Sequence, residues 1–223
     1  THAYTFGTYS SFLGATSKII KRSKVIIRSD LSSTTYNKAK NAPVYRTLLT
    51  YPFKIADAAY TFTLLEKKYL ANLGVNEKKI RVIPVGIDYQ KFSKTPMTDH
   101  DKYVSIGYVG RLCSQKGVHR ITAPLQKILR EDKHALVSFI GAIEDTNYAN
   151  EVLVSLKKYR NFKYLGYLTN VLPFYKMCNI ILVPSLVETG AITVLEAMAS
   201  GKVVIASNIN PIKEYIQHQH TGF

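Results

Sequence analysis

Two cationic side chains stand five residues apart just after an apolar segment. Segment 103–109 ends at Gly110, Arg111 follows directly, and Lys116 comes five residues later. A glycine lets the backbone approach a ligand closely, and two cations beside the start of a helix suit a diphosphate. The alternative is a solvated basic loop, which on this spacing alone is the more common explanation.

Two carboxylates follow a second apolar segment in the same way. Glu188 lies where segment 180–183 gives way to a helical pattern, and Glu196 lies about two turns further along that helix. Carboxylates beside a sugar accept hydrogen bonds from pairs of hydroxyl groups. The small residues 189–191 leave N–H groups open at the helix start, where a phosphate can bind. An acidic first turn explains Glu188 alone better, whereas Glu196 lies in an apolar context.

Both candidate sites require strands that end at one edge of a sheet. We expect strands at 103–109, 135–140, 162–165, 180–183 and 203–206, with helices near 121–129, 152–156, 172–177, 191–200 and 211–217. Continuous apolar, β-branched strands are typical of parallel sheets buried on both faces. Such sheets bind ligands beyond the carboxyl ends of their strands. This half is predicted to be a doubly wound, Rossmann-like α/β domain.

The first hundred residues are less regular. Strands are expected at 24–27, 60–64 and 80–83, with helices at 11–21 and 65–73. Three strands make an incomplete sheet. Because residues 89–101 have the polar composition of a linker, we predict an incomplete N-terminal α/β domain over 1–95 and a C-terminal domain over 96–223.

The chain of 223 residues is strongly basic. Thirty Lys and Arg against fifteen Asp and Glu give a net charge of +15, and residues 1–54 hold nine basic side chains and one acid, a net of +8. Such a field attracts nucleic acid, anionic lipid headgroups or phosphorylated small molecules. The two cysteines, Cys113 and Cys178, have no metal-ligand or redox spacing, which favours a reducing compartment and predicts a cytoplasmic protein.

Four motifs occur in order over residues 54–223. They are Ile83-Pro84-Val85-Gly86-Ile87-Asp88 with Phe92; Val109-Gly110-Arg111-Leu112 with Lys116-Gly117; Pro184-Ser185 with Glu188 and, after seven residues, Glu196-Ala197-Met198-Ala199; and Gly201 with Val203-Val204-Ile205-Ala206-Ser207. Together they resemble the retaining family-4 glycosyltransferases (glycosyltransferase group 1) of the GT-B fold. The resemblance implies an enzyme that moves a sugar from a nucleotide sugar to an acceptor with retention at the anomeric carbon.

The resemblance implies a catalytic role for the two cations. Arg111 and Lys116, with Gly110 at the turn, would bind the donor diphosphate and stabilise its charge as it leaves. The family is metal-independent, so no cofactor and no metal ion are expected. Residues 99–101, Asp-His-Asp, mimic the acidic metal motif of the other large glycosyltransferase fold. They lie in the predicted linker rather than at a strand end, and we expect no metal there.

The same resemblance implies roles for the residues that follow segment 180–183. Glu188 would act near the reacting carbon of the donor sugar, and Glu196 would hold the ribose hydroxyl groups. The backbone N–H groups of Ile192 and Thr193 would bind the distal phosphate.

The sequence also departs from the family pattern. Gly190 and Ala191 stand where the family usually has an aromatic residue and then glycine, and Val85 replaces a common asparagine. The family's first N-terminal strands precede Thr1, and its closing strand and helices would follow Phe223. We therefore expect this sequence to be part of a longer protein.

Two other functions compete with the glycosyltransferase hypothesis. The charge and the sixteen tyrosines fit a non-catalytic protein that binds nucleic acid or another anionic surface. The tyrosines are dispersed, however, without the alternation of aromatic and basic residues that single-stranded nucleic acid requires. An inactive remnant that still binds the donor is the other alternative.

The basic N-terminal segment suggests a peripheral membrane enzyme with a lipid or lipid-linked acceptor. Phe12, Leu13, Ile19 and Ile20 recur at helical spacing, beside Lys18, Lys21 and Arg22. Basic side chains near an anionic leaflet contribute about 1 kcal/mol each. The competing explanation, slightly favoured for this helix, is that its apolar residues pack against the sheet.

Overall fold

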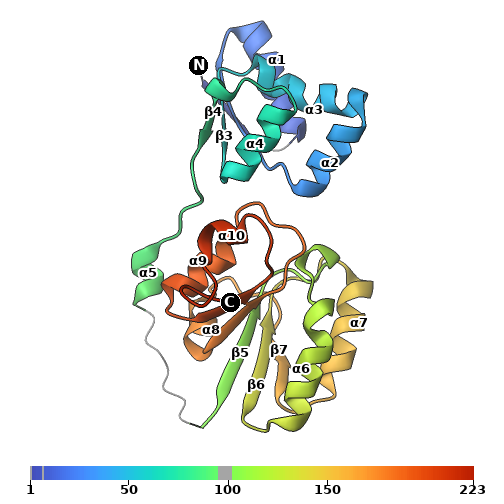
Figure 1. Cartoon of the computed structure of the whole chain (residues 1–223), viewed down its shortest axis with the longest axis vertical. Helices are drawn as coiled ribbons and strands as arrows, with labels where there is room; N and C mark the ends of the chain where they lie inside the picture. The colour runs from blue at the N-terminus through green and yellow to red at the C-terminus, as the bar shows by residue number, and fades with distance from the viewer. Residues whose placement is uncertain (1, 7, 95–101) are drawn as a thin grey trace. The chain divides into compact units, whose positions relative to one another are not determined.

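The computed structural model describes residues 2–6, 8–94 and 102–223 (Figure 1). The chain divides into two compact units, Thr1–Val85 with Val187–Gly190, and Gly86–Leu186 with Ala191–Phe223. Each unit contains a parallel sheet with helices connecting its strands. The predicted α/β fold class is confirmed.

The N-terminal unit has a four-stranded parallel sheet in the order β1-β2-β3-β4. Its elements are β1 (His2–Phe6), α1 (Thr8–Lys21), β2 (Lys24–Arg28), α2 (Ser33–Asn41), α3 (Pro43–Ile55), β3 (Ala58–Thr61), α4 (Leu64–Asn72), the 3-10 helix η1 (Glu77–Lys79) and β4 (Ile80–Val82). The predicted strands at 24–27 and 80–83 and both predicted helices are present, with ends that differ by up to three residues. Strand β1 and helices α2 and α3 were not predicted, so the sheet has four strands where three were expected.

The differences have local physical causes. The strand predicted at 60–64 lies earlier, because the Thr63 side chain accepts the Glu66 N–H and starts α4 at Leu64. Helix α2 is largely polar and buries only Ala39, so it has little apolar periodicity. Helix α3 contains Pro52, a residue that normally ends a helical pattern.

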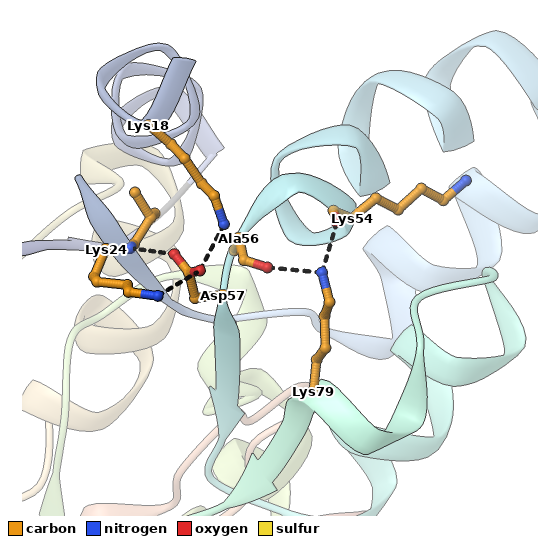
Figure 2. A network of polar contacts seen from close by, with 7 residues as sticks. Lys18, Lys24, Lys54, Ala56, Asp57 and Lys79 are labelled. Atoms are coloured by element: carbon orange, nitrogen blue, oxygen red, sulfur yellow. Dashed lines mark hydrogen bonds and ion pairs between the residues drawn. The ribbon is translucent and has the colours of Figure 1, made fainter. Parts of the chain in front are cut away.

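A charged cluster fastens the amino end of this sheet (Figure 2). Asp57, just before β3, pairs with Lys18 at 2.7 Å and with Lys24 at 3.8 Å, and it accepts the Val25 N–H at 2.9 Å. The hydrogen bond from Lys18 is the main reason that the pKa of Asp57 is lowered. The cluster ties α1 and β2 to β3, and the Asp57 carboxylate neutralises part of the positive charge that Lys18 and Lys24 bring to the N-terminal unit.

A second lysine contact satisfies carbonyl groups at the end of α3. Lys79 donates to the carbonyls of Lys54 at 3.0 Å and Ala56 at 2.9 Å (Figure 2). The last carbonyl groups of a helix have no partner within the helix. The ammonium group therefore joins α3 to the segment before β4.

The C-terminal unit has a five-stranded parallel sheet in the order β7-β6-β5-β8-β9. Its strands are β5 (Val104–Val109), β6 (Ala135–Ile140), β7 (Phe162–Tyr164), β8 (Ile180–Val183) and β9 (Val203–Ala206). Its helices are α5 (Tyr89–Ser93), the 3-10 helix η2 (Ser114–Lys116), α6 (His119–Glu131), α7 (Thr146–Lys157), α8 (Leu172–Met177), α9 (Ile192–Ala199) and α10 (Ile212–Tyr215). All five strands and all five helices predicted for residues 101–223 are present.

Helices cover both faces of this sheet (Figure 1). Leu125 of α6 and Leu153 of α7 belong to the core on one face, and Phe174 of α8 and Val194 of α9 belong to the core on the other. A parallel sheet buried on both faces is the arrangement that the continuous apolar strands predicted. The C-terminal unit is doubly wound.

The two units divide earlier along the chain than the sequence suggested. The division falls after Val85, whereas the predicted boundary lay between residues 95 and 96. Residues 89–93 of the predicted linker form α5, because Phe92 is buried in the C-terminal core and packs edge-on against Tyr175. Residues 95–101, including the Asp-His-Asp sequence at 99–101, lie outside the described part of the chain.

Glu66 is the buried carboxyl group of the N-terminal unit. Only 3% of its surface is exposed, and it accepts the Phe62 N–H at 3.0 Å and the Ser29 hydroxyl at 3.4 Å. Burial raises the pKa of Glu66 from 4.5 to about 7, because removing water penalises the charged form more than these hydrogen bonds favour it.

We expect this carboxyl group to make stability depend on pH. Between pH 4.5 and 7 the folded chain binds the Glu66 proton more tightly than the unfolded chain does. Stability therefore falls as pH rises through this range, by roughly 2–3 kcal/mol. Urea unfolding, followed by circular dichroism from pH 5 to 8.5, should show this slope in the wild type and not in Glu66→Gln.

The matched control is Glu77→Gln, which removes an exposed carboxylate paired with Lys67. Glu77→Gln should retain the wild-type slope. An unchanged slope in Glu66→Gln would contradict the titration assigned to Glu66.

Candidate functional site

The candidate site lies where the strand order of the C-terminal sheet reverses. The chain runs outward from β5 to β6 and β7, then returns to β8 on the other side of β5. Ligands of doubly wound sheets bind at such a switch point, beyond the carboxyl ends of the strands. The loops after β5 and β8, which carry the predicted residues, are therefore neighbours.

The loop after β5 is held closely against the loop after β6. The Gly110 N–H donates to the Ile140 carbonyl at 3.0 Å, and Gly141 has a φ of 141°. A Cβ atom at Gly141 would lie 1.8 Å from the Gly110 carbonyl oxygen, so only glycine permits this approach. The Tyr108 hydroxyl donates to the Arg111 carbonyl at 2.7 Å and fixes the backbone at the first candidate cation.

The Arg111 side chain is half exposed and forms an ion pair with Glu144. Glu144 lies in the loop after β6, between Ile140 and α7. It was not among the residues predicted from sequence. The position of Glu144, an acid shortly after a buried strand, is the same signal that identified Arg111 and could have drawn attention to it.

Lys116 is positioned by a close contact between the loops after β5 and β8. It ends η2, and Gly117 follows with a φ of 64°. A Cβ atom at Gly117 would lie 2.2 Å from the Pro184 carbonyl oxygen. The Leu186 N–H donates to the Gln115 carbonyl at 2.8 Å. These contacts place the half-buried Lys116 beside the carboxyl end of β8.

The start of α9 lies at the carboxyl end of β5. The Thr193 hydroxyl donates to the Val109 carbonyl at 3.4 Å. Ala191, in the left-handed conformation, provides no side-chain cap. The first N–H groups of a helix have no partner within the helix, so those of Ile192 and Thr193 can bind an anion at this edge.

A buried tyrosine, Tyr175, holds the Glu196 carboxylate through a hydrogen bond. Glu196 is half-buried on α9, and its carboxylate accepts the Tyr175 hydroxyl of α8 at 2.9 Å. Burial raises the pKa of Glu196, while the Tyr175 hydrogen bond and the charge of Lys91 oppose that rise. Burial and the nearby Glu196 raise the pKa of Tyr175 well above its usual value, so the phenol remains a donor. Tyr175 was predicted only as part of a helix.

The structure brings most of the predicted residues together. Gly110, Arg111, Lys116, Ile192 and Thr193 belong to loops or a helix start at the β5 and β8 edge, and Glu196 lies about one turn along the same helix. Glu188 lies in segment Val187–Gly190, which groups with the N-terminal unit. The role of Glu188 beside the donor sugar therefore stays a prediction.

An apolar cavity adjoins Arg111. It has a volume of about 270 Å³ and is lined by Val109, Gly110, Arg111, Ile140, Gly141, Ala142, Tyr167, Leu168 and Val171. The cavity lies at the carboxyl ends of β5 and β6. A flat, largely apolar group attached to a diphosphate would fit beside the cation.

The N-terminal unit has a separate cavity at the carboxyl end of β2. Its volume is about 170 Å³, and its lining combines Arg28, Asp30 and Tyr45 with the apolar side chains of Leu31 and Phe53. Asp30, the only acid among residues 1–54, is exposed. The mixture of polar and apolar groups suits a ligand with hydroxyl groups.

No metal site is evident in the part of the chain that the structure describes. Residues 2–6, 8–94 and 102–223 contain no group of three or more His, Cys, Asp or Glu side chains placed to hold an ion.

The model of the glycosyl transferases group 1 family matches residues 90–223, more than half of the chain. The chain belongs to this family. Its fold is that of GT-B glycosyltransferases: Anabaena HepE, in a crystal structure with UDP and glucose, superposes with a TM-score of 0.82 at 15% identity, covering 99% of this chain and 63% of HepE.

Two relatives that are similar in sequence are also named as glycosyltransferases. An uncharacterized glycosyltransferase of Methanocaldococcus jannaschii is 26% identical over 71% of this chain and 44% of its own length. The N,N'-diacetylbacillosaminyl-diphospho-undecaprenol alpha-1,3-N-acetylgalactosaminyltransferase of Campylobacter jejuni is 26% identical over 80% of this chain and 50% of its own length. The chain spans about half the length of these relatives.

We expect Tyr175→Phe to weaken nucleotide binding without changing any group at the surface of the site. The change removes the hydroxyl that holds Glu196, which raises the pKa of Glu196 further and frees its rotamer. Calorimetry with UDP, GDP and ADP should show an affinity loss of roughly fivefold to tenfold, less than the ~1.5–3 kcal/mol of a direct hydrogen bond to a charged group, because the lost hydroxyl acts only through Glu196.

Tyr148→Phe is the matched control, because the Tyr148 hydroxyl accepts the His119 N–H and does not contact Glu196. Nucleotide affinity that is lost equally in both variants would show that the tyrosines act only through packing.

Proposed function

We propose that this protein is a glycosyltransferase that moves a sugar from a nucleotide-sugar donor to an acceptor. The observation that supports the proposal most directly is the convergence of Arg111, Lys116 and the start of α9 at the switch point between β5 and β8. Two cations and a helix N-terminus form a site for a diphosphate. Membership of the glycosyl transferases group 1 family supports the same function.

The proposed chemistry places positive charge where the leaving group becomes negative. As the bond between the sugar and the diphosphate breaks, charge grows on the phosphate oxygens, and fixed cations stabilise it without reorganising. Arg111 and Lys116 supply that charge, so the transfer is proposed to need no metal ion. Glu188 would act near the reacting carbon. Retention of configuration is proposed from the resemblance of the four sequence motifs to the retaining family-4 glycosyltransferases.

The remaining parts of the donor fit the neighbouring features. Glu196, fixed by Tyr175, would accept hydrogen bonds from the ribose. The apolar cavity beside Arg111 would take the base. HepE, which has the same fold, was crystallised with UDP and glucose, which supports a nucleotide-sugar donor here.

The acceptor is proposed to bind the N-terminal unit. The cavity at the carboxyl end of β2 offers Arg28, Asp30 and Tyr45 to a hydroxyl-bearing group. The Campylobacter relative carries the name of an enzyme whose acceptor is linked to undecaprenol diphosphate. A lipid-linked acceptor is therefore the acceptor class we propose.

The function can be tested by ligand binding and then by turnover. The protein is tested with UDP-, GDP- and ADP-sugars and with the free nucleotides. At least one of them should raise the midpoint temperature of thermal unfolding, because a ligand that binds only the folded state stabilises it. Arg111→Ala and Lys116→Ala should each weaken that ligand by about 1.5–3 kcal/mol, roughly tenfold to a hundredfold. Affinities unchanged in both variants would remove the diphosphate assignment.

Glu188→Ala is the contrasting variant. It should spare nucleotide affinity and abolish sugar transfer, whereas Glu196→Ala should weaken nucleotide binding. A non-catalytic anion binder would instead retard DNA in a gel mobility-shift assay. That binding would depend on salt and would not change when nucleotide sugar is added. Tight nucleotide binding without turnover in the wild type would identify an inactive remnant.

The N-terminal unit is further proposed to meet an anionic membrane, as a peripheral cytoplasmic enzyme. On α1, Leu13, Ile19 and Ile20 are 71%, 61% and 78% exposed, whereas Ser11 and Ala15 are buried. The expectation that the apolar residues of this helix pack against the sheet is therefore wrong for these three, whereas Phe12 is half-buried. None of the described helices has the length and apolar character to cross a bilayer.

Helix α3, which packs against α1, adds a second exposed apolar stripe. Val44, Leu48 and Tyr51 are 76%, 53% and 46% exposed and recur at helical spacing. Exposed Arg46 and Lys54 lie on the same helix. An apolar stripe beside cations is the pattern of a helix that rests in the headgroup region of anionic lipid.

Vesicle sedimentation tests this surface. The protein should sediment with anionic but not neutral vesicles, and added salt should release it as screening increases. Ile20→Ser combined with Leu48→Ser should reduce sedimentation, whereas Val154→Ser, at a 71% exposed position on α7, should not. Equal recovery in the supernatant with both lipids at low salt would rule out this membrane role.

A further inference from the structure

The cation at the centre of the candidate site already has a carboxylate partner. Arg111 is 53% exposed and Glu144 is 47% exposed, and the two side chains form an ion pair. A diphosphate bound at the switch point would need the same guanidinium group. One guanidinium cannot make its full set of charged hydrogen bonds to both anions.

The position of Glu144 is built into the backbone. The Leu112 N–H donates to the Ala142 carbonyl at 2.8 Å, and the Leu112 carbonyl accepts the N–H groups of Glu144 and Asp145 at 3.3 and 3.2 Å. Asp145 then caps α7 by accepting the Tyr148 N–H. Leu112, which follows Arg111 in the chain, thus fixes the backbone of Glu144.

The Arg111–Glu144 ion pair is weak enough for a diphosphate to replace Glu144. An exposed ion pair is weak, and water and salt screen it. A diphosphate brings more charge, and the N–H groups of Ile192 and Thr193 and the Lys116 ammonium add to its binding. The ligand can therefore displace Glu144 from Arg111.

We propose that Glu144 is a positioning residue that holds Arg111 while the diphosphate site is empty and takes it back when the nucleotide leaves. The proposal rests on the function proposed above. Glu144 touches no reacting atom and takes part in no covalent step. Its carboxylate lowers the affinity for the nucleoside diphosphate product and speeds its release.

The test is a double-mutant cycle measured by calorimetry at low salt. The probes are inorganic pyrophosphate, UDP, GDP and ADP, each bound separately to the wild type, Glu144→Gln, Arg111→Ala and the double variant. Glu144→Gln should tighten the probe that binds best by about threefold to tenfold, and the gain should shrink as salt rises. In the Arg111→Ala background, Glu144→Gln should change affinity by much less.

Glu131→Gln is the matched control, because it removes the carboxylate of another exposed pair, with Arg130 on α6, and changes the net charge equally. It should leave affinity unchanged. Stopped-flow displacement should show slower release of the nucleotide from Glu144→Gln, which a loss of loop structure alone would not produce.

The outcomes separate the two proposals. A wild type that binds none of the probes would overturn the proposed function together with this inference. A wild type that binds, and that Arg111→Ala weakens, while Glu144→Gln leaves affinity unchanged or lowers it, would overturn the inference alone. Equal tightening in Glu131→Gln would also overturn it, because net charge would then explain the gain.

Discussion

The close approach of three loops around β5 is the constraint on which the candidate site depends. A side chain at Gly141 would collide with the Gly110 carbonyl, and one at Gly117 would collide with the Pro184 carbonyl. Because β5 lies between β6 and β8, these two contacts draw the flanking loops toward the same strand end. Arg111 receives Glu144 from one side, and Lys116 meets the β8 loop on the other. The charges are thus arranged by backbone contacts rather than by their own attraction.

The sequence predicted the C-terminal unit far better than the N-terminal unit, for a physical reason. In strand Ala135–Ile140 every residue except Leu136 is buried, and five of the six residues are apolar, so composition alone marks the strand. Helix α2 buries only Ala39 and leaves no such pattern. Phe92 joined a distant core, which no local pattern in a polar segment could indicate.

The same distinction applies to the site. Gly110, Arg111 and Lys116 could be predicted because strand ends are read from local sequence, and the structure places their loops together. Glu144 and Tyr175 contact Arg111 and Glu196 across 33 and 21 residues of sequence. Such partners depend on tertiary packing. The identity of Tyr175 gave little indication, since a tyrosine in a predicted helix is usually a core residue.

Ala191 shows how the packing of the C-terminal unit maintains a strained residue at the start of α9. Its φ of 45° is a conformation that costs a residue with a side chain roughly 1–2 kcal/mol, and the family usually has glycine there. The strain persists because the methyl group is buried in the core with Val194 and Ala197, while the Ala191 carbonyl accepts the Val194 N–H at 3.0 Å. Because the backbone conformation of Ala191 is fixed, the direction in which α9 begins is fixed as well. The direction of the first helical N–H groups, which belong to the candidate anion site, is therefore set by apolar packing behind the helix.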